Sequence, residues 1–200
     1  MTVKLKPKQT IIALDVSSLE ETKDLLSIVD KDLFRLKVGK QLFTSQGPKA
    51  IDELRSLGFD IFLDLKLHDI PNTVSKSLAN ICNLGVWMSN IHLLGGQEMI
   101  QEASATVKKS NSDMILVGVT ILTSLNENNL VELGFNSSAE EIAIKLAKLG
   151  KQNGVDGVVC SIEDISGIKA SLGGDFLSVT PGVRMSQDND DQKRSGSIYN

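Results

Sequence analysis

Short apolar runs rich in β-branched residues recur along the chain, and each is followed by a longer segment whose apolar residues have helical spacing. This alternation is typical of βα units around a parallel sheet. The runs predict seven strands, at residues 10–15, 33–37, 60–66, 88–92, 114–120, 157–160 and 176–180. The clearest helical segments are residues 18–29, 47–57, 73–84 and 139–152. Gly58, Gly85 and Gly150 are expected at helix ends.

Seven such units fit either an open, doubly wound sheet or most of an eight-stranded barrel. An open nucleotide-binding sheet would have a glycine-rich turn after its first strand, but Val16-Ser17-Ser18 follows Asp15. A barrel instead gathers polar residues at the carboxyl ends of many strands. Such residues close nearly every predicted strand here: Asp15, Lys37, Asp64 with Lys66, His92, Thr120 with Thr123, and Thr180. The pattern favours an α/β fold of the TIM (β/α)8 type.

The composition fits one globular domain spanning residues 1–200, with residues 1–9 as an amino-terminal extension. The chain has 200 residues, of which 41% are hydrophobic, and a net charge of −4. It has no basic stripe, so we expect no nucleic-acid partner. The apolar run at residues 11–14 is too short for a signal sequence or a membrane span, which leads us to expect a cytoplasmic protein without membrane contact. Cys82 and Cys160 lie in apolar stretches and are expected to be buried thiols.

Charged residues of both signs gather around the third predicted strand. Asp64 and Lys66 are two apart, so their side chains are expected on the same side of the strand, facing the barrel mouth. Asp69 follows in the loop just beyond, and Lys37 ends the preceding strand. Carboxylates flanking an ammonium keep it charged, and such an array suits proton delivery to a carbanion. A structural ion pair is the plainer interpretation of a single Asp-x-Lys, but burying several charges for structure alone is costly.

The segment at residues 64–73, DLKLHDIPNT, resembles the signature of orotidine 5′-monophosphate decarboxylases. The resemblance runs from about residue 10 to residue 194, with the motifs in family order. They are residues 12–15 (IALD), 35–39 (RLKVG), 85–92 (GVWMSNIH), 119–124 (VTILTS), 180–184 (TPGVR) and 191–194 (DQKR). Leu93 departs from the alanine that the family usually has after this histidine, so crowded packing is expected there.

The resemblance implies decarboxylation of orotidine 5′-monophosphate to uridine 5′-monophosphate, the last step of pyrimidine synthesis, without metal or cofactor. Lys66 would be the proton donor, and Asp64 would lie against the departing carboxylate. Lys37 would pair with Asp64 and touch the ribose. Asp69 would reach across a two-fold axis into the neighbouring site, which implies a homodimer.

The resemblance also assigns residues to substrate binding. Asp15 would bind ribose hydroxyls, and Thr73 and Thr123 would contact the nucleotide. Arg184 and Gln192 would belong to a segment that closes over the phosphate. Gln187 competes with Gln192, because the segment between Arg184 and Asp191 is one residue shorter than the commonest family form.

The carboxyl end departs from the family pattern. Family members continue after the DQKR motif with a helix, an eighth strand and a Gly-Arg pair that grips the phosphate, whereas residues 195–200, SGSIYN, match nothing in that pattern. On this basis we expect a barrel whose eighth strand is missing, and impaired turnover by the chain of 200 residues.

Two other functions remain open from the sequence. The first is a metal-dependent sugar-phosphate decarboxylase or aldolase of the same superfamily, which shares the Asp-x-Lys-x-x-Asp core. The residues around this core, in particular 70–73 and 180–184, favour the nucleotide enzyme. The second is an inactive barrel that only binds a nucleotide or a full-length partner subunit.

Overall fold

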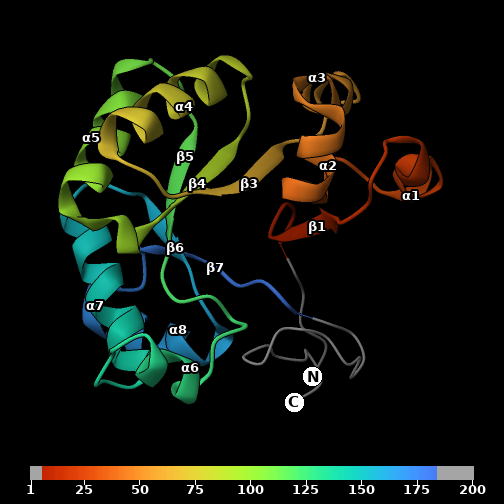
Figure 1. Ribbon diagram of the computed structural model, residues 1–200. Helices are drawn as coiled ribbons and strands as arrows, with labels where there is room; N and C mark the ends of the chain where they lie inside the picture. Colours follow the sequence, from red (N-terminus) through yellow and green to blue (C-terminus); the bar gives the residue numbers. More distant parts are fainter. Residues whose placement is uncertain (1–5, 184–200) are drawn as a thin grey trace.

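The fold is a curled parallel sheet covered by helices, seen in a computed structural model that describes residues 6–183 (Figure 1). All seven predicted strands are confirmed, with ends shifted by no more than two residues. The strands are β1 (Thr10–Leu14), β2 (Phe34–Gly39), β3 (Ile61–Leu67), β4 (Met88–His92), β5 (Ile115–Val119), β6 (Gly157–Val159) and β7 (Leu177–Val179).

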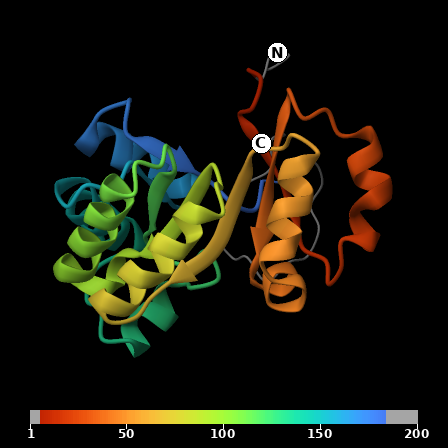
Figure 2. The same cartoon turned by 90° about the horizontal axis from the view of Figure 1, so that it is seen from above.

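Each strand is parallel to the next, in the order β1-β2-β3-β4-β5-β6-β7. Parallel neighbours joined by helical crossovers are the arrangement expected of a (β/α)8-type barrel. Seen from above, the elements at the amino-terminal end of the sheet (red and orange) and those at its carboxyl-terminal end (blue) lie on opposite sides of β3 (Figure 2). Within residues 6–183, β1 and β7 have one strand neighbour each. Residues 184–200 lie outside the described range, so the predictions for Arg184, Gln187, Gln192 and residues 195–200 do too.

Helices connect the strands and cover the outer face of the sheet. They are α1 (Lys23–Ile28), α2 (Lys40–Gln46), α3 (Pro48–Ser56), α4 (Pro71–Asn83), α5 (Gly96–Lys109), α6 (Glu127–Glu132), α7 (Ala139–Gln152) and α8 (Ile165–Leu172). Short 3₁₀ turns lie at Glu20–Thr22, Leu93–Gly95 and Ile162–Asp164. No helix among residues 6–183 is long and apolar enough to cross a membrane.

The glycine expected to end α7 lies inside that helix, so this prediction was wrong. The helix continues to Gln152, and Gly154, with φ of 92°, follows its end. The reason is packing: a Cβ on Gly150 would lie 3.0 Å from side-chain atoms of both Leu93 and Val155. Gly118 gives Leu93 further room, since a Cβ there would lie 2.3 Å from Leu93 Cδ2. The two glycines thus accommodate the bulky Leu93, which is fully buried.

Alternate residues of each strand face two different apolar clusters. Leu36, Ile61, Leu63 and Ile91 point outward into the large core beneath the helices. Phe62, Met88, Val117, Val119 and Val159 form a smaller cluster on the inner face. Because side chains alternate along a strand, Lys37 and Asp64 occupy positions whose side chains lie on the inner face of the sheet. The hydrophobic pattern that builds the two clusters therefore also directs these charges inward.

Candidate active site

The third strand is irregular where its charged residues begin. Leu63 pairs with Ser89 and Leu67 with Ile91, so four steps along β3 match two steps along β4. Lys66 lies within this bulge and has a φ of 52°, a left-handed conformation that is uncommon outside glycine. Bulges of this kind redirect side chains next to active sites. The regular alternation that led us to expect Asp64 and Lys66 on one side is thus broken, yet the two side chains still meet.

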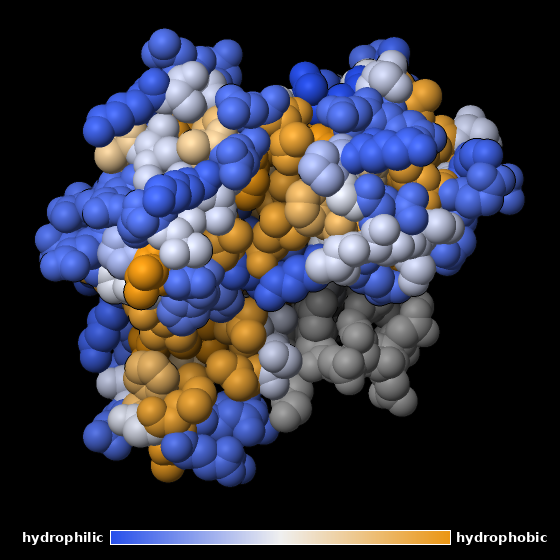
Figure 3. All heavy atoms as spheres, turned by 45° about the horizontal axis from the view of Figure 1, so that its top comes forward, coloured by the Kyte–Doolittle hydropathy of each residue, from blue (hydrophilic) through white to orange (hydrophobic). Residues whose placement is uncertain are grey.

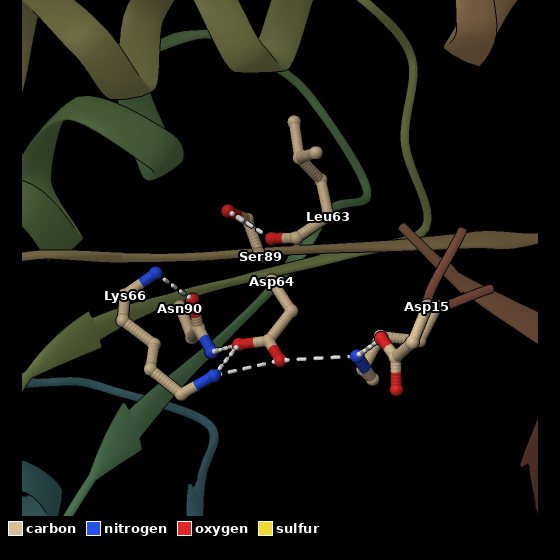
Figure 4. A network of polar contacts seen from close by, with 7 residues as sticks. Asp15, Leu63, Asp64, Lys66, Ser89 and Asn90 are labelled. Carbon is tan, nitrogen blue, oxygen red and sulfur yellow. Dashed lines mark hydrogen bonds and ion pairs between the residues drawn. The ribbon is translucent and has the colours of Figure 1, made fainter. Parts of the chain in front are cut away.

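Four of the predicted residues form one network, which we call the charged array: Asp15, Lys37, Asp64 and Lys66 (Figure 4). Lys66 Nζ lies 2.7 Å from Asp64 Oδ1 and 2.8 Å from Oδ2. Lys37 Nζ lies 3.6 Å from Asp64 Oδ2 and 3.1 Å from Asp15 Oδ1. The charges alternate in sign along the array. Lys37 comes from β2, Asp64 and Lys66 come from β3, and Asp15 directly follows β1.

Asp64 is the most buried member of the array, with a side chain that is 9% exposed, against 19% for Lys37 and 30% for Lys66. Burial alone would raise the pKa of Asp64. The Lys66 charge, hydrogen bonds from Lys66 and Asn90, and the Lys37 charge outweigh burial and hold this pKa below its ordinary value. Asp64 is therefore ionised at neutral pH, and it presents a negative charge to anything bound beside it.

Asn90 is a site residue that the sequence analysis did not single out. Its side chain is fully buried, and it donates a hydrogen bond of 2.6 Å to Asp64 Oδ1. It also accepts one of 2.8 Å from the backbone N–H of Lys66. The available signal was an amide at an inward-facing position of an apolar strand, beside the strand that carries Asp64.

His92, at the end of β4, is a neutral neighbour of the array. Burial, followed by the charges of His68, Lys66 and Lys40, lowers the pKa of His92 to about 4. Its ring lies 5.3 Å from that of His68, centroid to centroid. Its buried Nδ1 has no hydrogen-bond partner among residues 6–183. His92 therefore adds polarity to the site at neutral pH without adding charge.

The remaining predicted residues lie around the array without joining it. Asp69 is exposed in the loop after β3, where its carboxylate accepts a hydrogen bond from the Ile70 backbone, and it forms no ion pair within residues 6–183. Thr73 is exposed in the first turn of α4, and Thr123 is half-buried after β5. Arg184, Gln187 and Gln192 lie outside the described residues. In the described part of the chain, no group of three or more His, Cys, Asp or Glu side chains could hold a metal ion.

Comparison with protein families identifies a match over almost the whole chain. The protein-family model described as "Orotidine 5'-phosphate decarboxylase / HUMPS family" matches residues 8–198. The chain is 44% identical over 186 residues to an orotidine 5′-phosphate decarboxylase of Marinomonas sp. (strain MWYL1). This alignment covers 92% of this chain and 79% of the relative. It is 46% identical over 187 residues to the enzyme of that name from Saccharophagus degradans, which covers 93% and 79%.

Solved structures give the same result for the fold. The orotidine 5′-phosphate decarboxylase of Lactobacillus acidophilus superposes with a TM-score of 0.82 at 38% identity, covering 88% of this chain and 82% of the other. The orotidine 5′-monophosphate decarboxylase of Methanocaldococcus jannaschii, in complex with the inhibitor BMP, superposes with a TM-score of 0.71 at 26% identity. That match covers 88% of this chain and 78% of the other. Both neighbours bear out the barrel-type architecture.

Proposed function

This chain belongs to the orotidine 5′-phosphate decarboxylase / HUMPS family, and we propose that it decarboxylates orotidine 5′-monophosphate to uridine 5′-monophosphate in pyrimidine biosynthesis. The observation that carries the proposal is the ammonium of Lys66, held against both oxygens of the buried Asp64 carboxylate. The relatives quoted above are named for this reaction, which favours it over a sugar-phosphate reaction. We further propose that the chain acts in the cytoplasm.

The charged array supports a mechanism that uses only its own side chains. A substrate carboxylate placed beside ionised Asp64 meets like charge, and this repulsion is relieved when the carbon–carbon bond breaks and carbon dioxide leaves. The electron pair stays on the ring carbon. The Lys66 ammonium stabilises this carbanion and then transfers a proton from Nζ to it, forming the new carbon–hydrogen bond. Solvent returns a proton to Lys66.

Substrate binding is proposed for residues on the array and around it. Lys37 bridges Asp64 and Asp15, so the ribose hydroxyls would bind at the Asp15 end, where the carboxylate is exposed. Thr73, in the first turn of α4, and Thr123, in the segment after β5, would contact the nucleotide. Arg184 and Gln192, with Gln187 as the competing candidate, would hold the phosphate.

We propose a homodimer in which Asp69 completes the site of the neighbouring subunit. Asp69 is exposed and has no ion-pair partner within residues 6–183, so its charge is available to a second chain. Large apolar side chains are exposed in the loops after β3, β4 and β5, at Ile70 (66%), Leu94 (42%) and Leu122 (36%). Apolar residues also gather in a band between polar areas on the face drawn in Figure 3. Contiguous exposed apolar surface is typical of protein–protein contacts.

Product analysis tests the proposed reaction. Purified chain is incubated with orotidine 5′-monophosphate, and uridine 5′-monophosphate is measured by chromatography. A parallel sample receives a β-keto sugar phosphate acid, the class of substrate that the related sugar-phosphate decarboxylases use. We expect uridine 5′-monophosphate in the first sample, and in the second no more carbon dioxide than the sugar phosphate acid releases without protein. Decarboxylation of the sugar phosphate alone would overturn the proposal.

A further inference from the structure

We propose that Asn90 is a positioning residue that holds Asp64 and Lys66 in their reactive arrangement; this inference rests on the function proposed above. Asn90 lies on β4, next to β3, and shares its inward parity with Met88 of the inner cluster. It is fully buried and contacts two members of the charged array at once (Figure 4). Its position on β4 therefore allows it to orient both Asp64 and Lys66 on β3.

The two hydrogen bonds of Asn90 determine which way its amide points. The Lys66 backbone N–H can only donate, so it must face the Asn90 carbonyl oxygen, at 2.8 Å. An ionised carboxylate can only accept, so Asp64 Oδ1 must face the Asn90 NH₂ group, at 2.6 Å. The position thus requires one donor and one acceptor on a single short side chain. An amide meets this requirement, whereas alanine and ionised aspartate do not.

The contact with Lys66 lies where β3 departs from regular pairing. Lys66 has a φ of 52°, and the bulge leaves β3 with two more residues than β4 across the same interval. A non-glycine residue in this conformation persists when its surroundings hold it there. The Asn90 carbonyl supplies a partner for the Lys66 N–H inside the bulge. Asn90 therefore holds the backbone from which the Lys66 ammonium extends, as well as the carboxylate that the ammonium contacts.

Ser89 provides a matched control on the same strand. Its hydroxyl donates a hydrogen bond of 3.1 Å to the Leu63 carbonyl, where the bulge begins. Like Asn90, it is fully buried and bonds β4 to β3 through its side chain. Within residues 6–183, its hydroxyl forms no hydrogen bond with a side chain of the charged array. Loss of the Ser89 hydroxyl tests strand pairing alone, and loss of the Asn90 amide tests strand pairing together with positioning.

Steady-state kinetics of Asn90→Ala and Ser89→Ala separate the two effects. Because small displacements of reacting groups cost about 10²-fold in rate, we expect Asn90→Ala to lower kcat by about 10²-fold with KM changed little. Ser89→Ala is expected to keep kcat within about threefold of the unsubstituted chain, since one neutral hydrogen bond away from the reacting groups has little effect on the barrier. Circular dichroism confirms that the variants compared are folded.

Asn90→Asp adds a readout that a purely structural role would not change. Ionised aspartate at this position repels Asp64 and cannot donate to it. Protonated aspartate can donate to Asp64 through its hydroxyl and accept from the Lys66 N–H through its carbonyl, as the amide does. The activity of Asn90→Asp relative to the unsubstituted chain should therefore rise as pH falls from 8 towards 5. This ratio remains measurable even if Asn90→Ala fails to fold.

A measurement independent of turnover distinguishes failure of this inference from failure of the proposed function. The carboxyl pKa of Asp64, followed by ¹³C NMR, should rise in Asn90→Ala and stay unchanged in Ser89→Ala, because Asn90 donates to the ionised form. If the unsubstituted chain is inactive but the Asp64 pKa still rises in Asn90→Ala, the proposed reaction is contradicted, and Asn90 remains the residue that positions Asp64. An unmoved Asp64 pKa, or kcat for Asn90→Ala within threefold of that for Ser89→Ala, overturns the inference.

Discussion

The Lys66 ammonium contacts both carboxylate oxygens of Asp64, at 2.7 and 2.8 Å. The side chain of the acid is 9% exposed and that of the ammonium is 30% exposed, so the protein encloses the pair on one side and the solvent reaches it on the other. An ammonium fixed in this way needs little reorganisation when negative charge develops next to it. The pair therefore connects the geometry of the site to the proposed proton transfer.

Asp64→Asn tests the repulsion between Asp64 and the substrate carboxylate. Removing the charge should lower kcat by about 10²-fold or more, in line with the loss of one preorganised electrostatic group. Substrate should bind at least as tightly as before, because the like charge beside its carboxylate is gone, whereas binding of uridine 5′-monophosphate, which lacks the carboxylate, should change less. Single-turnover rates and calorimetric titration provide both values. A parallel weakening of substrate and product binding would contradict the assigned position of Asp64.

A mixture of inactive variants tests the shared site. If Asp69 acts across a two-fold interface, Lys66→Ala and Asp69→Ala are each inactive, but a heterodimer of the two contains one site with both residues intact. Random exchange of subunits should then restore about a quarter of the normal activity. Sedimentation should show a dimer. A monomer, or a mixture as inactive as its components, would argue against the shared site.

The neutral His92 predicts a pH-dependent contribution to stability. Its pKa in the fold is about 4, below the ordinary 6.5, so the unfolded chain binds the proton more readily. The contribution is complete above pH 6.5 and is lost as pH falls towards 4, by up to about 3 kcal/mol. Urea unfolding at several pH values should show this loss in the unsubstituted chain and not in His92→Asn. His68→Asn, at an exposed position, is the control and should retain most of the loss.

A chelator separates the proposed reaction from that of the metal-dependent relatives. The proposed proton transfer uses Lys66 and Asp64 alone, so turnover after dialysis against EDTA should equal turnover before it. Adding Mg²⁺ back should change the rate by less than about twofold, as expected when no step depends on a bound Lewis acid. A rate that disappears with EDTA and returns with Mg²⁺ would favour the metal-dependent reaction.

The strands and most of the charged array could be predicted from the sequence because they depend on local periodicity. Apolar alternation located each strand, and the parity of Lys37 and Asp64 followed from it. The bulge at Lys66 could not be predicted in this way, because it depends on how β3 pairs with β4, 24 residues away at the Lys66–Asn90 hydrogen bond. Asn90 was missed for the same reason. Its role comes from a contact between strands, which a pattern within one strand does not contain.

Glycine position was a less reliable guide. Gly58 and Gly85 follow α3 and α4 with positive φ, as predicted. Gly150 does not end α7, because there the absence of a side chain makes room for Leu93 and Val155. A glycine can serve conformation or close packing, and only the three-dimensional neighbours distinguish the two. The predictions for Arg184, Gln187, Gln192 and residues 195–200 concern the part of the chain outside residues 6–183.

The central claim is that Lys66 delivers the proton during decarboxylation of orotidine 5′-monophosphate. Its most direct test is a single-turnover assay with the chain in excess over substrate, so that slow conversion is also detected, comparing the unsubstituted chain with Lys66→Ala. Lys145→Ala, which removes an exposed lysine from α7, is the control. We expect uridine 5′-monophosphate from the unsubstituted chain and the control, and a rate for Lys66→Ala that is lower by about 10³-fold or more. Equal rates in all three chains, or no product from any, would contradict the claim.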